Sequence, residues 1–110
     1  MSFNDTEELA EKAADIIENN KVLVPNEVIG EIVYVLEKVY KVKNDELSEI
    51  LICLFQYENI KVDDLEVIKT ALELYGRRRF DFVDTLLYAY NHIRNYQVCT
   101  FDKKLDKLLK

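Results

Sequence analysis

Apolar and polar positions follow one another along the chain in a pattern that predicts helices separated by short strands. Residues 5–19 carry apolar side chains at helical spacing, and Asp5 and Glu8 stand in the spacing of a capping box, so a first helix is expected there. The short β-branched run at residues 21–24 predicts a strand. Pro25 closes this run and suits the first turn of a helix over residues 26–41.

The second half of the chain continues this alternation. Asn44 or Asp45 is expected to cap a helix that runs to about Tyr57. Four further elements are expected: a strand over Ile60–Val62, a helix from Asp63 or Asp64 to Gly76, a helix from Asp81 to about Asn95, and a strand over Gln97–Phe101. Residues 102–110 then predict a closing helix.

Strands separated by helices predict an α/β fold with parallel pairing and right-handed crossovers. We therefore expect a helix-rich, three-layer α/β/α arrangement with a short parallel sheet. The 110 residues and 13.0 kDa suit one domain over residues 1–110. Parallel sheets place ligand sites at the carboxyl ends of their strands, which directs attention to residues 25–27 and to Asp102.

The amino-acid composition indicates how much loop the domain contains and where in the cell it is expected. Glycine (2) and proline (1) are scarce, which leaves little material for long loops or linkers. No apolar run approaches the roughly 18 residues that span a bilayer, and the polar start is no signal peptide, so no membrane association and a cytoplasmic location are expected. Cys53 and Cys99 lie in apolar runs, which is typical of buried reduced thiols.

The net charge of −6 argues against broad binding to a phosphate backbone, because such binding depends on many Lys and Arg side chains. Any contact with nucleic acid is therefore expected to be local. The dense basic cluster Arg77, Arg78 and Arg79 either complements the dipole at a helix C-terminus or clamps a phosphate.

Four carboxylates are candidates for chemistry. Glu31 lies just outside the apolar arc of its helix, where it is either solvated or functional. Asp81 and Asp84 share one face of a helix's first turn, where they either favour the helix N-terminus or bind a cation that relieves their repulsion. Asp102 follows the last expected strand and can cap the closing helix and bind an ion.

Acidic oxygens without His or Cys partners suit Mg²⁺ or Mn²⁺ rather than zinc. His92 is the only histidine, and a structural role is expected for it. No Ser/His/Asp pattern and no glycine-rich phosphate loop occurs, which argues against serine hydrolases and nucleotide-binding fingerprints.

Three stretches together resemble successive motifs of the PIN domain family, the α/β/α fold of ribonucleases such as VapC-type toxins. These stretches are Val24–Leu36, Phe80–Ala89 and Val98–Leu105. The resemblance implies that Glu31, Asp84 and Asp102 are catalytic and bind Mg²⁺ or Mn²⁺, with Asp81 as a supporting metal ligand. It also implies hydrolysis of an RNA phosphodiester, with RNA, an antitoxin protein and further copies of the chain as partners.

The family's opening strand, with its first catalytic aspartate, has no counterpart in the opening residues. Asp5-Thr6 echoes that motif, but residues 1–4 do not form a strand pattern, so Asp5 is interpreted as a helix cap. The chain is then a truncated nuclease, a degenerate member, or a domain that completes its sheet with another chain. The alternative function is a catalytically inactive interaction or oligomerisation module.

Overall fold

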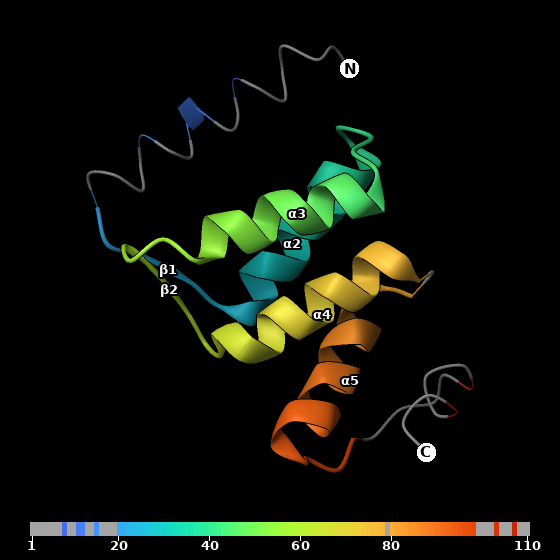
Figure 1. Cartoon of the computed structure of the whole chain (residues 1–110). Helices are drawn as coiled ribbons and strands as arrows, with labels where there is room; N and C mark the ends of the chain where they lie inside the picture. The colour runs from blue at the N-terminus through green and yellow to red at the C-terminus, as the bar shows by residue number, and fades with distance from the viewer. Residues whose placement is uncertain are drawn as a thin grey trace.

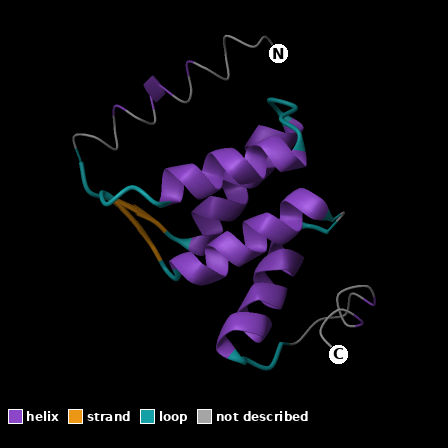
Figure 2. Ribbon diagram, viewed as in Figure 1, coloured by secondary structure: helices purple, strands orange, loops and turns teal. Residues whose placement is uncertain are grey.

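The chain forms a helix-rich α/β fold in the computed structural model (Figure 2). The structure describes residues 20–78 and 80–98, together with Glu8, Glu11, Lys12, Asp15, Lys103 and Lys107. Its elements are β1 (Val22–Val24), α2 (Asn26–Lys38), α3 (Asn44–Phe55), β2 (Ile60–Val62), α4 (Leu65–Arg77) and α5 (Phe82–Arg94). The α/β class expected from the sequence is confirmed.

The two strands lie side by side at one end of the helices (Figure 1). They pair in parallel with Val22 opposite Ile60 and Val24 opposite Val62. The connection between them runs through α2 and α3, as parallel pairing requires. The prediction of a short parallel sheet is therefore confirmed.

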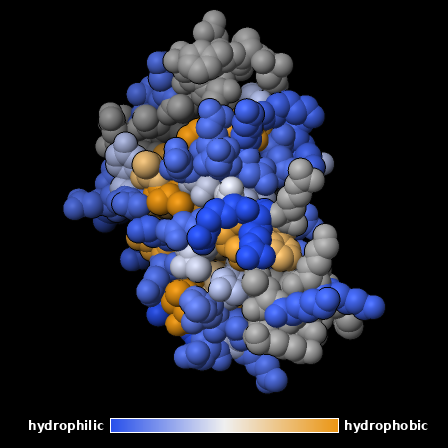
Figure 3. Space-filling view, turned by 45° about the vertical axis from the view of Figure 1, so that its right-hand side comes forward, coloured by the Kyte–Doolittle hydropathy of each residue, from blue (hydrophilic) through white to orange (hydrophobic). Residues whose placement is uncertain are grey.

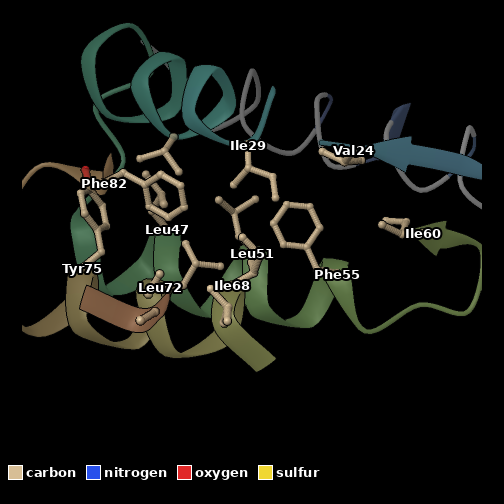
Figure 4. Close-up of a cluster of buried hydrophobic side chains, with 14 of the residues drawn as sticks. Val24, Ile29, Leu47, Leu51, Phe55, Ile60, Ile68, Leu72, Tyr75 and Phe82 are labelled. Atoms are coloured by element: carbon tan, nitrogen blue, oxygen red, sulfur yellow. The ribbon is translucent and has the colours of Figure 1, made fainter. Parts of the chain in front are cut away.

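The core lies between α2, α3 and α4 (Figure 4). Its fully covered side chains include Ile29, Leu47, Leu51, Ile68 and Leu72, with Phe55 and Tyr75 almost as deeply buried. Helices α3 and α4 approach closely at Ser48, whose hydroxyl donates to the Leu72 carbonyl at 2.6 Å. A Cβ at Gly76 would lie 2.9 Å from the Ser48 Cβ, so this contact has room only for glycine.

Several helix ends differ from the predicted bounds by one to three residues. Helix α2 ends at Lys38 because the N–H groups of Val39 and Tyr40 both bond to the Val35 carbonyl, and Lys41 adopts a left-handed φ of 57°. Helix α3 starts at Asn44, which is earlier than either proposed cap would allow. Lys43 occupies its N-cap position, so the expectation that Asn44 or Asp45 caps this helix is wrong.

The prediction that Cys53 is buried is also wrong, since its side chain is exposed. The apolar run around it is longer than the buried stripe of α3, which contains Leu47, Leu51 and Phe55. Cys53 falls half a helical turn from Leu51 and therefore faces outward. Cys99 lies outside the described residues.

The expected strand over Gln97–Phe101 is wrong at its start, because Gln97 and Val98 are in no strand, and Cys99–Phe101 lie outside the described residues. Asn95 ends α5 with a φ of 60°, and the Asn91 side chain donates to the Tyr96 carbonyl at 3.0 Å. The left-handed backbone at Asn95 and this hydrogen bond accompany irregular chain at residues 95–98 in place of a strand. The described residues of the two terminal segments, Glu8, Glu11, Lys12, Asp15, Lys103 and Lys107, are helical.

Candidate active site and the carboxyl edge of the sheet

Polar side chains gather where the two strands end. The residues that follow the paired positions Val24 and Val62 are brought together by the parallel register. The backbone N–H of Asn26, the first residue of α2, donates to Asp63 Oδ2 at 3.2 Å. The sequence indicated residues 25–27 as a ligand edge, and Asn26 does lie at this edge.

Asn26 also connects this edge to α5. Its Nδ2 group donates to the Tyr90 hydroxyl at 2.9 Å. Its Oδ1 atom is buried and is the one such side-chain atom of the described residues without a hydrogen-bond partner. The contact holds the start of α2 against the second half of α5.

Arg94, the last residue of α5, connects the C-terminal end of α5 to the N-terminal end of α4. Its guanidinium donates to both carboxylate oxygens of Asp64, at 2.8 and 3.1 Å, and to Glu66 at 3.0 Å. Asp64 Oδ1 also accepts from the Val67 N–H at 3.3 Å, so of the two aspartates expected to start this helix, Asp64 is the one that caps α4. The hydrogen bond from Arg94 lowers the pKa of Asp64 below its ordinary value and raises that of Arg94.

This pair predicts a pH-dependent contribution to stability. Because the folded-state pKa of Asp64 lies below its unfolded value, the stabilisation is fully present above the ordinary pKa of 3.8 and is lost as the pH falls through the lowered pKa. Substituting Arg94→Gln should therefore lower the free energy of unfolding at neutral pH, and the difference from the wild type should shrink below about pH 4. Urea unfolding of both proteins between about pH 3 and pH 7 measures the difference in their free energies of unfolding. If this difference grew as the pH fell, the stabilising role of the Asp64–Arg94 pair would be contradicted.

Glu31 lies in the middle of α2 on its outward face. Its side chain is exposed, and its neighbours on that face, Val28 and Val35, are 39% and 40% exposed. The sequence placed all three at or beside an apolar arc. In the structure this arc is fully buried only at Ile29 and Val33, and Ile32, Leu36 and Tyr40 are partly buried against the core. Glu31 lies on the exposed side of the helix.

Asp81 and Asp84 lie together at the start of α5. Asp81 occupies the N-cap position, where its backbone carbonyl accepts from the Thr85 N–H at 3.1 Å, although its side chain makes no capping bond. Asp84 is half-buried in the first turn. The Thr85 hydroxyl is fully buried and donates to the Phe82 carbonyl at 2.7 Å, which anchors the turn that carries both aspartates.

These oxygen donors suit a hard cation such as Mg²⁺, which keeps several waters and needs only one or two carboxylates. Within residues 20–78 and 80–98 and the six other described positions, no three His, Cys, Asp or Glu side chains are grouped so that they could hold an ion. Glu31 therefore does not join the two aspartates in one such group. Asp102 lies outside the described residues.

The described basic residues at the end of α4, Arg77 and Arg78, are exposed. Arg77 Nε donates to the Glu73 carbonyl at 3.3 Å, and Arg78 occupies the C-cap position. Both are therefore compatible with the first of the two roles considered for them, at a helix C-terminus, and their heads remain accessible. Arg79 lies outside the described residues.

Two features of this region were not predicted. The hydrogen bonds of Tyr90 and Arg94 join residues more than 25 positions apart, and no local sequence pattern predicts them. The Tyr88 and His92 rings stack with centroids 5.4 Å apart and planes 10° apart. Their spacing of four residues, which places side chains on one helix face, is a signal that the sequence did contain.

The protein is therefore a helix-rich α/β protein with a parallel sheet. Acidic side chains lie at the carboxyl edge of this sheet and at the N-terminal ends of α4 and α5. The model of the PIN domain family matches residues 1–109, and the chain therefore belongs to the PIN domain family. Membership indicates a nuclease-type function, and PIN domains generally bind divalent metal ions. No curated protein and no solved structure gave a match.

Within the described part of the chain, no helix is long and apolar enough to cross a membrane.

Proposed function

We propose that this protein is a metal-dependent endoribonuclease, the toxin component of a toxin–antitoxin pair that acts in the cytoplasm. The proposal is carried by the match to the PIN domain family over residues 1–109. It is supported by the pair of aspartates, Asp81 and Asp84, that starts α5. RNA is the proposed substrate, and an antitoxin protein and further copies of the chain are the proposed partners.

Glu31, Asp81, Asp84 and Asp102 are the residues proposed to hold Mg²⁺ or Mn²⁺. The bound ion would supply charge that activates a water and stabilises the attacking and leaving oxygens of the phosphodiester. Asp84 contributes a half-buried carboxylate held in place by the anchored first turn of α5. Arg77 and Arg78, exposed on the segment that leads to this turn, are proposed to contact a substrate phosphate.

The alternative is a catalytically inactive interaction or oligomerisation module. It is favoured by large apolar side chains that are exposed on β1 and α2, where Leu23 is 67% and Tyr34 is 63% exposed. Figure 3 shows one face of the molecule, where hydrophobic side chains form small separate groups among hydrophilic ones.

The test is incubation of the folded chain with a panel of structured and single-stranded RNAs, in Mn²⁺ and then in Mg²⁺. Cleavage is expected with either ion and should stop when EDTA is added. Absence of cleavage by a sample with a cooperative unfolding transition would contradict the nuclease proposal. Sedimentation measurements on the same sample would then test the interaction module, which requires self-association or a bound partner.

A further inference from the structure

An open groove runs between the start of α3 and the end of α4, which lie side by side (Figure 1). Its volume is about 380 Å³. Two small residues form its floor, because the Ser48 hydroxyl turns inward to the Leu72 carbonyl and Gly76 has no side chain. Ile52, one turn further along α3, is half-buried and continues this floor. The two helices therefore leave a hollow where larger side chains would fill the space.

The walls of this groove are acidic. Asp45 and Glu49 line it from α3, and Glu73 lines it from α4. All three residues are exposed, and among the ion pairs of the described residues none involves their carboxylates. Arg77 also lines the groove, but its Nε group donates to the backbone carbonyl of Glu73. The groove thus carries an excess of negative charge above an apolar floor.

The arrangement of these carboxylates favours a basic side chain over other ligands. Within the described part of the chain, no three His, Cys, Asp or Glu side chains are grouped so that they could hold a metal ion. Ligands that carry phosphate are repelled by the acidic walls. A long basic side chain suits both the floor and the walls, because its aliphatic stem lies on apolar surface while its charged head reaches a carboxylate. Arginine suits them best, since its guanidinium binds a carboxylate through two parallel hydrogen bonds.

We propose that this groove is a docking site for an arginine-containing segment of a partner protein. Asp45 and Glu49 are four residues apart on α3, which corresponds to a rise of about 6 Å along the helix. In an extended chain, side chains two positions apart point to the same side and are separated by about 6.6–6.8 Å. The segment that fits the groove is therefore extended, with arginines at alternate positions. This inference goes beyond the proposed nuclease function and does not depend on it.

The test is a titration of the isotope-labelled 110-residue chain with a peptide of about seven residues in which alanine and arginine alternate. Amide NMR shifts report where the peptide binds. The same peptide with citrulline in place of arginine is the matched probe, because citrulline keeps the aliphatic stem but carries no charge. The arginine peptide is expected to shift the amides at the start of α3 and the end of α4, and the citrulline peptide should leave them unchanged.

Two double substitutions that change the net charge equally locate the binding site. Glu49→Gln with Glu73→Gln removes one carboxylate from each wall and is expected to weaken binding by about 2- to 30-fold, the range for two exposed ion pairs. Glu27→Gln with Glu58→Gln removes two exposed carboxylates that do not line the groove, and it should leave the affinity unchanged. The unfolding midpoints of both proteins should match that of the wild type, because all four side chains are exposed.

Three results of the titration would overturn the docking site. They are an absence of shifts in α3 and α4, equal binding of the citrulline peptide, and an equal loss of affinity in the two doubly substituted proteins. Sedimentation of the wild type tests a second copy of the chain as the occupant. Self-association that is abolished by Glu49→Gln with Glu73→Gln would show that a second copy fills the groove, and it would also overturn the proposal of a partner protein.

The outcome is separable from that of the proposed function, because the titration contains neither RNA nor a metal ion. Shifts in the groove of a protein that never cleaves RNA would refute the nuclease and leave the docking site standing. Metal-dependent cleavage by a protein that gives no shifts with the arginine peptide would refute the docking site and leave the nuclease standing.

Discussion

Substituting Asp84→Asn is expected to lower the rate of metal-dependent RNA cleavage by at least about 100-fold. The amide keeps the shape of the side chain but removes the negative charge that the proposed Mg²⁺ or Mn²⁺ ion requires. Asp84 is half-buried in the first turn of α5, and Thr85 anchors that turn from inside the core. Its position is thus maintained by the fold rather than by solvent-exposed contacts.

The expected loss of activity should not be accompanied by unfolding. Loss of one negative charge at a helix N-terminus costs about 0.3–1 kcal/mol, and relief of repulsion from Asp81 offsets part of it. Single-turnover cleavage at saturating Mn²⁺ and the affinity for Mn²⁺ itself are the two measurements. Wild-type rates and wild-type Mn²⁺ affinity in the Asp84→Asn protein would contradict a metal-binding role.

Glu58→Gln is the matched control for this experiment. Glu58 is exposed in the turn that follows α3, whereas α5 begins near the end of α4, where Tyr75 and Phe82 make an edge-to-face ring contact 6.2 Å between centroids. The substitution removes the same unit of charge from the same chain. It should leave cleavage and Mn²⁺ binding unchanged, which separates the local role of Asp84 from a general effect of net charge.

Phe55→Ala is expected to lower the free energy of unfolding by about 3–5 kcal/mol. Phe55 is 2% exposed at the end of α3. Figure 4 shows its ring between the helix residues Ile29 and Leu51 and the strand residues Val24 and Ile60. Sheets of two short strands are marginal without apolar packing, so loss of this ring removes packing from both strands and from the helices.

Urea unfolding followed by circular dichroism measures this effect, with Tyr57→Ala as the control. Tyr57 is an aromatic residue two positions away but is 55% exposed, and its removal should change stability by less than about 0.5 kcal/mol. A Phe55→Ala protein within about 1 kcal/mol of the wild type would show that the sheet does not depend on this ring.

Much of the local structure could be predicted because its causes are local. Pro25 after a β-branched run predicted the junction of β1 and α2, and Asp64 predicted the start of α4 through a bond to Val67 three residues away. Helix ends were less predictable. The apolar pattern of α2 continues to Tyr40, but the helix ends at Lys38, where the N–H groups of Val39 and Tyr40 both donate to the Val35 carbonyl.

The candidate site was predictable in part. Asp81 and Asp84 were placed on the first turn of α5 by capping and periodicity, and they lie there. The relation of Glu31 to these aspartates depends on how α2 and α5 cross, which no residue pattern encodes. The positions of Asp102 and Arg79 are outside the described residues, so their assigned roles stay predictions.

By itself, the sequence determined the order of the elements between Val22 and Arg94, the parallel α/β class and the motifs of the PIN domain family. These follow from side-chain periodicity and capping, which involve residues within a few positions of one another. Tertiary structure alone decided which apolar positions are covered, and so left Cys53 and Leu23 exposed. It also decided that Asn26 meets Tyr90, because a contact between distant residues depends on the packing of whole helices.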